Sequence, residues 1–126
     1  VAGDGHLAVR GLLGAVGVGA MLGSIDLLCL PSIVPESFSL VLRESAALGV
    51  PALVSNLGAP AELMAETGAG LALPAGDPAA WAQAIAQVQS DPAVLERWRA
   101  ALPLPLRVEE ETFLYESLYR QFRKAG

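Results

Sequence analysis

Short apolar runs alternate with segments of helical periodicity along the first 73 residues. One run covers residues 25–30 and stops at a proline, and another covers residues 51–55 and stops at an asparagine. Runs of this length without polar alternation are typical of strands that are covered on both faces, so we expect strands there. Residues 7–12 and 69–73 are weaker strand candidates.

Helices are predicted between these runs. One covers residues 39–48 and ends at Gly49, a residue suited to the left-handed position after a helix. The other covers residues 60–67, begins with a proline in its first turn and ends at Gly68. This spacing predicts an α/β fold, a parallel sheet of about four strands with helices on both faces.

After residue 74 the pattern is helical. Asp77 and Asp91 each precede a proline, which predicts two helix N-caps. Residues 106–126 are predicted to form the C-terminal helix. We expect the apolar stripe of this helix either to dock on another domain or to pack on its own domain. The stripe consists of Val108, Thr112, Tyr115, Tyr119 and Phe122.

Composition narrows the class of protein. A chain of 126 residues with 53% hydrophobic and 17% charged residues predicts one folded domain, covering residues 1–126. The net charge of −5 and the scattered basic residues argue against a nucleic-acid partner. The single cysteine, Cys29, lies in an apolar run, so we expect a buried side chain and a reducing, cytoplasmic compartment. The single histidine, His6, has no companion ligands, so we expect no metal.

The glycine-rich opening raises two further possibilities. The longest uncharged stretch, residues 11–25, holds fifteen residues, fewer than the ~20 of a spanning helix, so no transmembrane segment is expected. The same stretch resembles a dinucleotide fingerprint. After Gly17 and Gly19, however, the next glycine is Gly23, one position late. Because the spacing matches the fingerprint only in part, a nicotinamide or flavin enzyme remains a rival interpretation, but a weaker one.

The segment that joins the strand at 25–30 to the helix at 39–48 carries the most chemistry. Ligands of doubly wound sheets bind where a strand ends and a helix begins. Leu42, at the third helical position, cannot fold back on the amides of the first turn as a glutamate would. These free donors suit a phosphate, and they belong to Ser37, Phe38, Ser39 and Leu40.

Two carboxylates bracket that amide cluster. Glu36 precedes the helix and Glu44 projects from its second turn. Each can accept two hydroxyls of a sugar, so a nucleotide-sugar, with phosphates between two hydroxylated rings, suits the layout. The alternative is that both glutamates are solvated surface side chains.

Four segments in register carry a resemblance to a known family: residues 26–32, 35–51, 57–62 and 74–78. Within the second, seven residues separate Glu36 from Glu44. This arrangement resembles the C-terminal donor-binding domain of retaining glycosyltransferases of family four, which have the GT-B fold. The resemblance runs from about residue 7 to the end.

The resemblance implies a Rossmann-like domain that binds a nucleotide-sugar, and transfer of its sugar to an acceptor with retention, without a metal or other cofactor. It implies that Glu36 is the catalytic residue beside the anomeric carbon and that Glu44 holds the ribose. The sugar and diphosphate would be bound by the amides of Ser37, Phe38, Ser39 and Leu40.

Departures from the family pattern leave an alternative open. Gly58-Ala59 stands where the family has two glycines, and Ser39 where it often has one. The family's upstream Arg and Lys have no counterpart between Gly11 and Leu42. The alternative is a non-catalytic nucleotide-sugar-binding or interaction module of the same fold.

The family's N-terminal acceptor domain is not in this sequence. We therefore expect the chain to supply the donor-binding part, folding alone without catalysing turnover. A truncated sheet would expose an edge through which two copies could associate.

Overall fold

The computed structural model describes residues 11–104 and 107–124. Its core is a parallel sheet in the order β1-β2-β3, with Cys29 opposite Leu53 and Leu53 opposite Leu71. The strands are β1 (Leu28–Leu30), β2 (Ala52–Ser55) and β3 (Gly70–Leu73). These three strand predictions are confirmed, although only the end of the first run is a strand.

The described residues hold three strands rather than about four. Of the fourth candidate, residues 7–10 lie outside the described residues, as does His6, and Gly11 and Leu12 have no regular secondary structure. β1 is therefore an edge strand of the described sheet.

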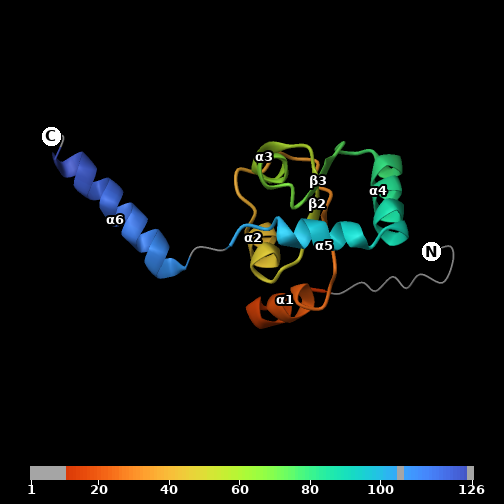
Figure 1. The fold of residues 1–126 in the computed structure, drawn as a ribbon, viewed down its shortest axis with the longest axis horizontal. Coiled ribbons are helices and arrows are strands. Elements are labelled where there is room, and N and C mark those ends of the chain that lie inside the picture. The colour runs from red at the N-terminus through yellow and green to blue at the C-terminus, as the bar shows by residue number, and fades with distance from the viewer. Residues whose placement is uncertain (1–10, 105–106, 125–126) are drawn as a thin grey trace.

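Six helices complete the described part of the chain (Figure 1). They are α1 (Ala15–Leu22), α2 (Leu40–Ala47), α3 (Gly58–Thr67), α4 (Pro78–Ser90), α5 (Ala93–Ala100) and α6 (Val108–Lys124). As predicted, left-handed glycines follow α2 and α3, with φ values of +77° at Gly49 and +69° at Gly68. The glycine-rich opening forms α1 itself, and no described strand precedes it as a dinucleotide fingerprint requires.

Helices cover both faces of the sheet, as predicted. β2 is the central strand and all four of its residues are buried. Ala52 and Val54 face one side, where they pack in a cluster with Leu22 of α1, Leu42 of α2 and Met64 of α3. Leu53 faces the other side and packs with residues of α4 and α5: Trp81, Ala84, Val88 and Trp98. Alternation along one strand therefore divides the core into two layers.

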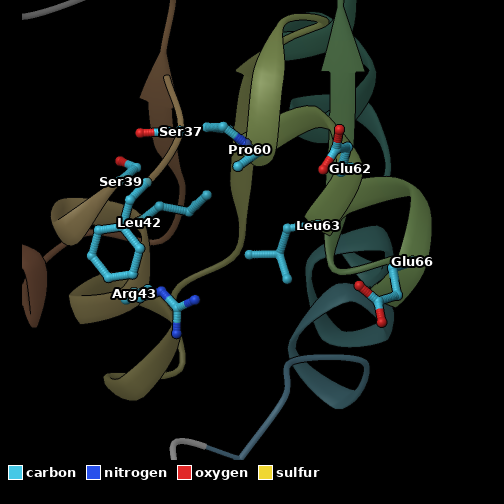
Figure 2. A pocket seen from close by; sticks show the side chains of 10 residues that line it. Ser37, Ser39, Leu42, Arg43, Pro60, Glu62, Leu63 and Glu66 are labelled. Atoms are coloured by element: carbon cyan, nitrogen blue, oxygen red, sulfur yellow. The ribbon is translucent and has the colours of Figure 1, made fainter. Parts of the chain in front are cut away.

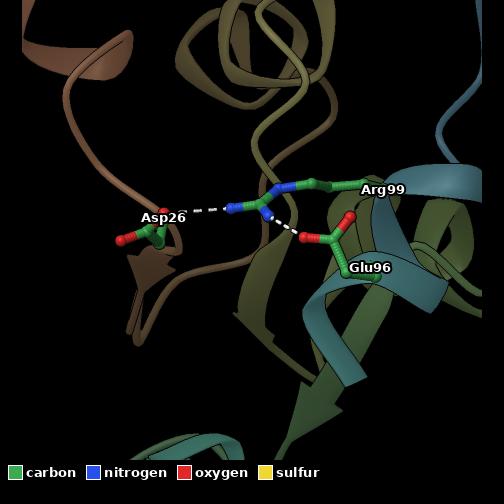
Figure 3. A network of polar contacts seen from close by, with 3 residues as sticks. All are labelled: Asp26, Glu96 and Arg99. Atoms are coloured by element: carbon green, nitrogen blue, oxygen red, sulfur yellow. Dashed lines mark hydrogen bonds and ion pairs between the residues drawn. The ribbon is translucent and has the colours of Figure 1, made fainter. Parts of the chain in front are cut away.

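Arg99 ties α5 to the segment that enters β1 (Figure 3). Its guanidinium lies 3.0 Å from the carboxylate of Asp26 and also pairs with Glu96 on its own helix. The Asp26 side chain is 83% exposed, so this network adds little to stability.

The two predicted N-caps differ. The Asp77 carboxylate accepts hydrogen bonds of 3.1 and 3.2 Å from the amides of Ala79 and Ala80, which confirms the first. The second prediction is wrong, because the proline after Asp91 occupies the N-cap position of α5 and Asp91 is the C-cap of α4. With so short a junction, the Asp91 carboxylate turns outward and pairs with Arg97 at 3.4 Å.

Cys29 is exposed, so the prediction of a buried side chain is wrong. The physical reason is the position of β1 at the edge of the described sheet, where alternate side chains of a short strand have little to cover them. Desolvation by the neighbouring atoms still raises the pKa of the thiol above its ordinary value.

Helix α6 projects away from the rest of the molecule (Figure 1). Of its predicted apolar stripe, Val108 is 74%, Tyr115 63% and Tyr119 70% exposed. These three side chains therefore do not pack on the sheet and its covering helices, which leaves docking on another domain as the open prediction; the side chain of Phe122 lies outside the described part of the chain. In the described part of the chain, no helix has the length and apolar character needed to cross a membrane.

Candidate functional site

The start of α2 presents unpaired amides at the carboxyl edge of the sheet. Its N-cap, Ser39, has an extended backbone and makes no capping hydrogen bond through its side chain. Among the hydrogen bonds of the described residues, none uses the N–H groups of residues 37–40. Ser37 is exposed, Phe38 is 56% and Leu40 63% exposed, and Ser39 is buried, so the loop is open to solvent at three of these four residues. These amides are free to bind an anion, and the positive end of the helix dipole favours one.

Glu36 is held at both its side chain and its backbone. The hydroxyl of Ser32 donates a hydrogen bond of 2.8 Å to the Glu36 carboxylate. The amide of Ala59 donates a hydrogen bond of 2.9 Å to the Glu36 carbonyl oxygen. The residue is half-buried, so its carboxylate has a restricted orientation beside the amide cluster.

Gly58 makes the contact between the β2–α3 turn and Glu36 possible. It has a φ of +63°, and a Cβ at this position would collide with the Glu36 carbonyl oxygen and lie 2.9 Å from the Glu36 nitrogen. Only glycine fits both conditions. The family's second glycine is Ala59 here, and this alanine keeps its amide bonded to Glu36. The contact therefore depends on the glycine that the sequence retains.

A groove of about 190 Å³ runs between α2 and α3 beside this loop (Figure 2). We call it the α2–α3 groove. One wall is formed by Ser37, Phe38, Ser39, Leu42 and Arg43, and the other by Ala59, Pro60, Glu62, Leu63 and Glu66. Figure 2 shows Arg43 on the α2 side and the two glutamates on the α3 side.

Arg43 stacks on Phe38. The centre of its guanidinium lies 4.4 Å from the centroid of the Phe38 ring, a cation–π distance. No sequence pattern predicted this contact, although the two residues are only five positions apart in the chain. The stack holds a cation near the amides of residues 37–40, in a chain that has no Lys or Arg between Gly11 and Leu42.

Glu44 lies on a different side of α2. It is exposed, does not line the α2–α3 groove, and forms no ion pair within the described residues. One residue corresponds to about 100° around a helix, which separates Glu44 from Arg43. The structure thus brings Glu36 together with Ser32 and Gly58, and leaves Glu44 free on its own flank of α2.

The fold and this site define a Rossmann-like α/β domain with an uncapped helix start, whose amides are unpaired, at the edge of a parallel sheet. Residues 11–102 match the family described as Glycosyl transferases group 1. The chain belongs to that family.

Relatives and a solved structure agree with this assignment. The chain is 35% identical over 96 residues to a phosphatidyl-myo-inositol mannosyltransferase of Mycobacterium leprae, covering 76% of this chain and 26% of the relative. It is 39% identical over 66 residues to a D-inositol 3-phosphate glycosyltransferase of Corynebacterium urealyticum, covering 52% of this chain and 15% of the relative.

The fold is similar to that of sucrose-phosphate synthase from Thermosynechococcus elongatus, with a TM-score of 0.68 and 27% identity. That match covers 84% of this chain and 27% of the other, and that neighbour is a glycosyltransferase of the GT-B type. The chain therefore spans about a quarter or less of the length of these proteins.

Proposed function

We propose that this chain is the donor-binding part of a retaining glycosyltransferase whose sugar comes from a nucleotide-sugar. The observation that carries the proposal is the set of unpaired amides at residues 37–40, beside a Glu36 carboxylate held by Ser32. Membership of the group 1 family supports a sugar-transfer reaction. Backbone N–H donors bind the phosphates of such a ligand, and a carboxylate acceptor beside them binds the hydroxyls of its sugar.

In this proposal the amides of residues 37–40 bind the donor diphosphate. When the bond between the anomeric carbon and the phosphate oxygen breaks, negative charge grows on that oxygen, and N–H groups already aimed at it lower the barrier. The acceptor hydroxyl forms its new bond on the same face of the sugar and gives its proton to the departing phosphate. Configuration at the anomeric carbon is then retained.

The two glutamates have separate roles in the proposal. Glu36 accepts hydroxyl hydrogens of the transferred sugar, and the hydrogen bonds from Ser32 and Ala59 fix its orientation for that contact. Glu44, exposed on α2 and free of ion pairs within the described residues, accepts the two hydroxyls of the ribose. The acceptor and the cations that neutralise the diphosphate would come from the remainder of a longer protein.

Calorimetry with UDP- and GDP-linked hexoses, each compared with UDP or GDP alone, tests this assignment. Glu44→Ala should weaken the sugar-bearing and sugar-free ligands alike, by about tenfold for a lost charged hydrogen bond. Glu36→Gln should weaken only the sugar-bearing ligands. Glu109→Ala, which removes an exposed carboxylate of α6 that does not line the α2–α3 groove, serves as the matched control. Absence of binding to every ligand, or a Glu44→Ala affinity equal to that of the control, would contradict the proposal.

A non-catalytic binding module of the same fold is the second candidate. It is favoured by one observation, the lack of any Lys or Arg between Gly11 and Leu42 to neutralise a leaving diphosphate. An assay of a longer protein that carries this chain distinguishes the two candidates. Release of sugar from the bound donor supports the transferase, and binding without release supports the module.

A further inference from the structure

Ser55 has a buried hydroxyl that makes no hydrogen bond within the described part of the chain. It is the last residue of β2 and is 3% exposed, and no described residue donates to or accepts from its Oγ. Buried polar atoms in folded proteins are nearly always paired, often with an internal water, because an unpaired one is destabilising. A buried hydroxyl at the end of a strand, next to the candidate site, therefore calls for a partner.

A small cavity of about 10 Å³ borders this hydroxyl. Its lining residues are Leu30, Ser32, Val34, Glu36, Ser55, Leu57 and Pro60. A cavity of ~10–15 Å³ holds one water when it offers two to four polar partners. Ser32 and Glu36, joined by their 2.8 Å hydrogen bond, line the same cavity as Ser55 and provide such partners.

We propose that Ser55 is a positioning residue for Glu36, acting through one internal water. The Ser55 hydroxyl donates to the water, and the water donates to the Glu36 carboxylate. Together with Ser32, this arrangement restrains the carboxylate from two directions, while Ala59 restrains the backbone of the same residue. The inference rests on the proposed role of Glu36 toward the sugar.

The position of Ser55 gives this restraint a reason. β1 and β2 are hydrogen-bonded neighbours, so the residues that follow both strands meet at one edge of the sheet. The loop that carries Ser32 and Glu36 has no regular secondary structure to hold it. A polar link from Ser55 connects the carboxylate to β2, the most buried of the described strands.

Ser55→Ala tests the proposal, with Ser45→Ala as a matched control. Ser45 is also a fully buried serine, but its hydroxyl donates to the Leu42 carbonyl oxygen within α2. Calorimetry compares UDP- or GDP-linked hexoses with UDP or GDP alone. We expect Ser55→Ala to weaken only the sugar-bearing ligands, by about three- to tenfold for one hydrogen bond, and to have no further effect in a Glu36→Ala background, which lacks an acceptor for the water.

The outcomes distinguish this inference from the proposed function. If Ser55→Ala binds both ligand types as tightly as Ser45→Ala does, the positioning role is overturned while the proposed function stands. The same conclusion follows if Ser55→Ala weakens binding of both ligand types equally. If the unaltered chain binds no ligand, the proposed function fails. A high-resolution crystal structure of the unaltered chain tests the water by itself. An ordered water bonded to Ser55 Oγ and the Glu36 carboxylate supports it, and its absence overturns the inference even if Ser55→Ala does not fold.

Discussion

The backbone of Gly58 lies directly against the backbone of Glu36, in the loop that follows the neighbouring strand. The next amide, that of Ala59, donates a 2.9 Å hydrogen bond to the Glu36 carbonyl oxygen. Two loops far apart in sequence are thereby joined at the residue that we assign to the sugar. The geometry of the candidate site consequently depends on the absence of a Cβ atom at position 58.

Gly58→Ala should be more destabilising than Gly49→Ala. Both glycines have positive φ values, +63° and +77°, so both substitutions impose the backbone cost of about 1–2 kcal/mol. A Cβ at position 49 has nothing within 4 Å, whereas one at position 58 collides with Glu36. We expect an additional loss of about 1–3 kcal/mol in the free energy of unfolding for Gly58→Ala. Urea denaturation of the two variants measures it, and equal losses would contradict the contact.

Asp77→Ala should be more destabilising than Asp91→Ala, although both residues precede a proline. Asp77 caps α4 with two hydrogen bonds, so we expect its loss to cost about 0.5–2 kcal/mol. Asp91 makes one exposed ion pair, and we expect its replacement to cost less than about 0.5 kcal/mol. Thermal unfolding ranks the variants, and the reverse order would mean that Asp91 caps α5 after all.

Removal of every residue after Leu104 should leave the sheet and its covering helices stable. The apolar side chains of α6 that the structure describes are exposed, so their loss removes little buried surface, and we expect the free energy of unfolding to stay within about 0.5 kcal/mol. Trp98→Ala, which opens the core beside Leu53, should cost about 3–5 kcal/mol and serves as the positive control. Denaturation followed by tryptophan fluorescence reports on both variants. A large loss on truncation would place α6 against the sheet in solution.

Cys29 should react slowly for an exposed thiol. Desolvation raises its pKa, so at a given pH less of it is the reactive thiolate than in the unfolded chain. The rate of alkylation by iodoacetamide should therefore rise with pH around a higher midpoint in the folded protein than in urea. A folded midpoint equal to or below the unfolded one would mean that the strand edge does not desolvate the sulfur.

Much of the fold follows from local sequence. The apolar runs at residues 25–30 and 51–55 predict strands because the covered residues of a parallel sheet have no polar alternation. Gly49 and Gly68 predict the ends of two helices because they adopt positive φ without strain. The unpaired amides at residues 37–40 also follow from local order, since a helix start without a capping side chain leaves them free.

What sequence alone missed depends on neighbours brought together by the sheet. The exposure of Cys29 depends on how much of the edge strand β1 the rest of the fold covers. The failure of Asp91 as a cap depends on how closely α4 precedes α5. Ser55 ends β2 and Ser32 lies two residues after the end of β1. Ligand-binding residues gather at such positions, so the place of both serines in the sequence was a signal that could have singled them out.

The sequence by itself determined the strands, the helix ends, the free amides and the spacing of Glu36 and Glu44, because each depends on bonding between residues near in the chain. The tertiary structure decided what surrounds Glu36. Parallel pairing of β1 with β2 carries Ser55 and Gly58 to it, and no local pattern encodes that pairing, since it requires the order and register of strands separated by a helix.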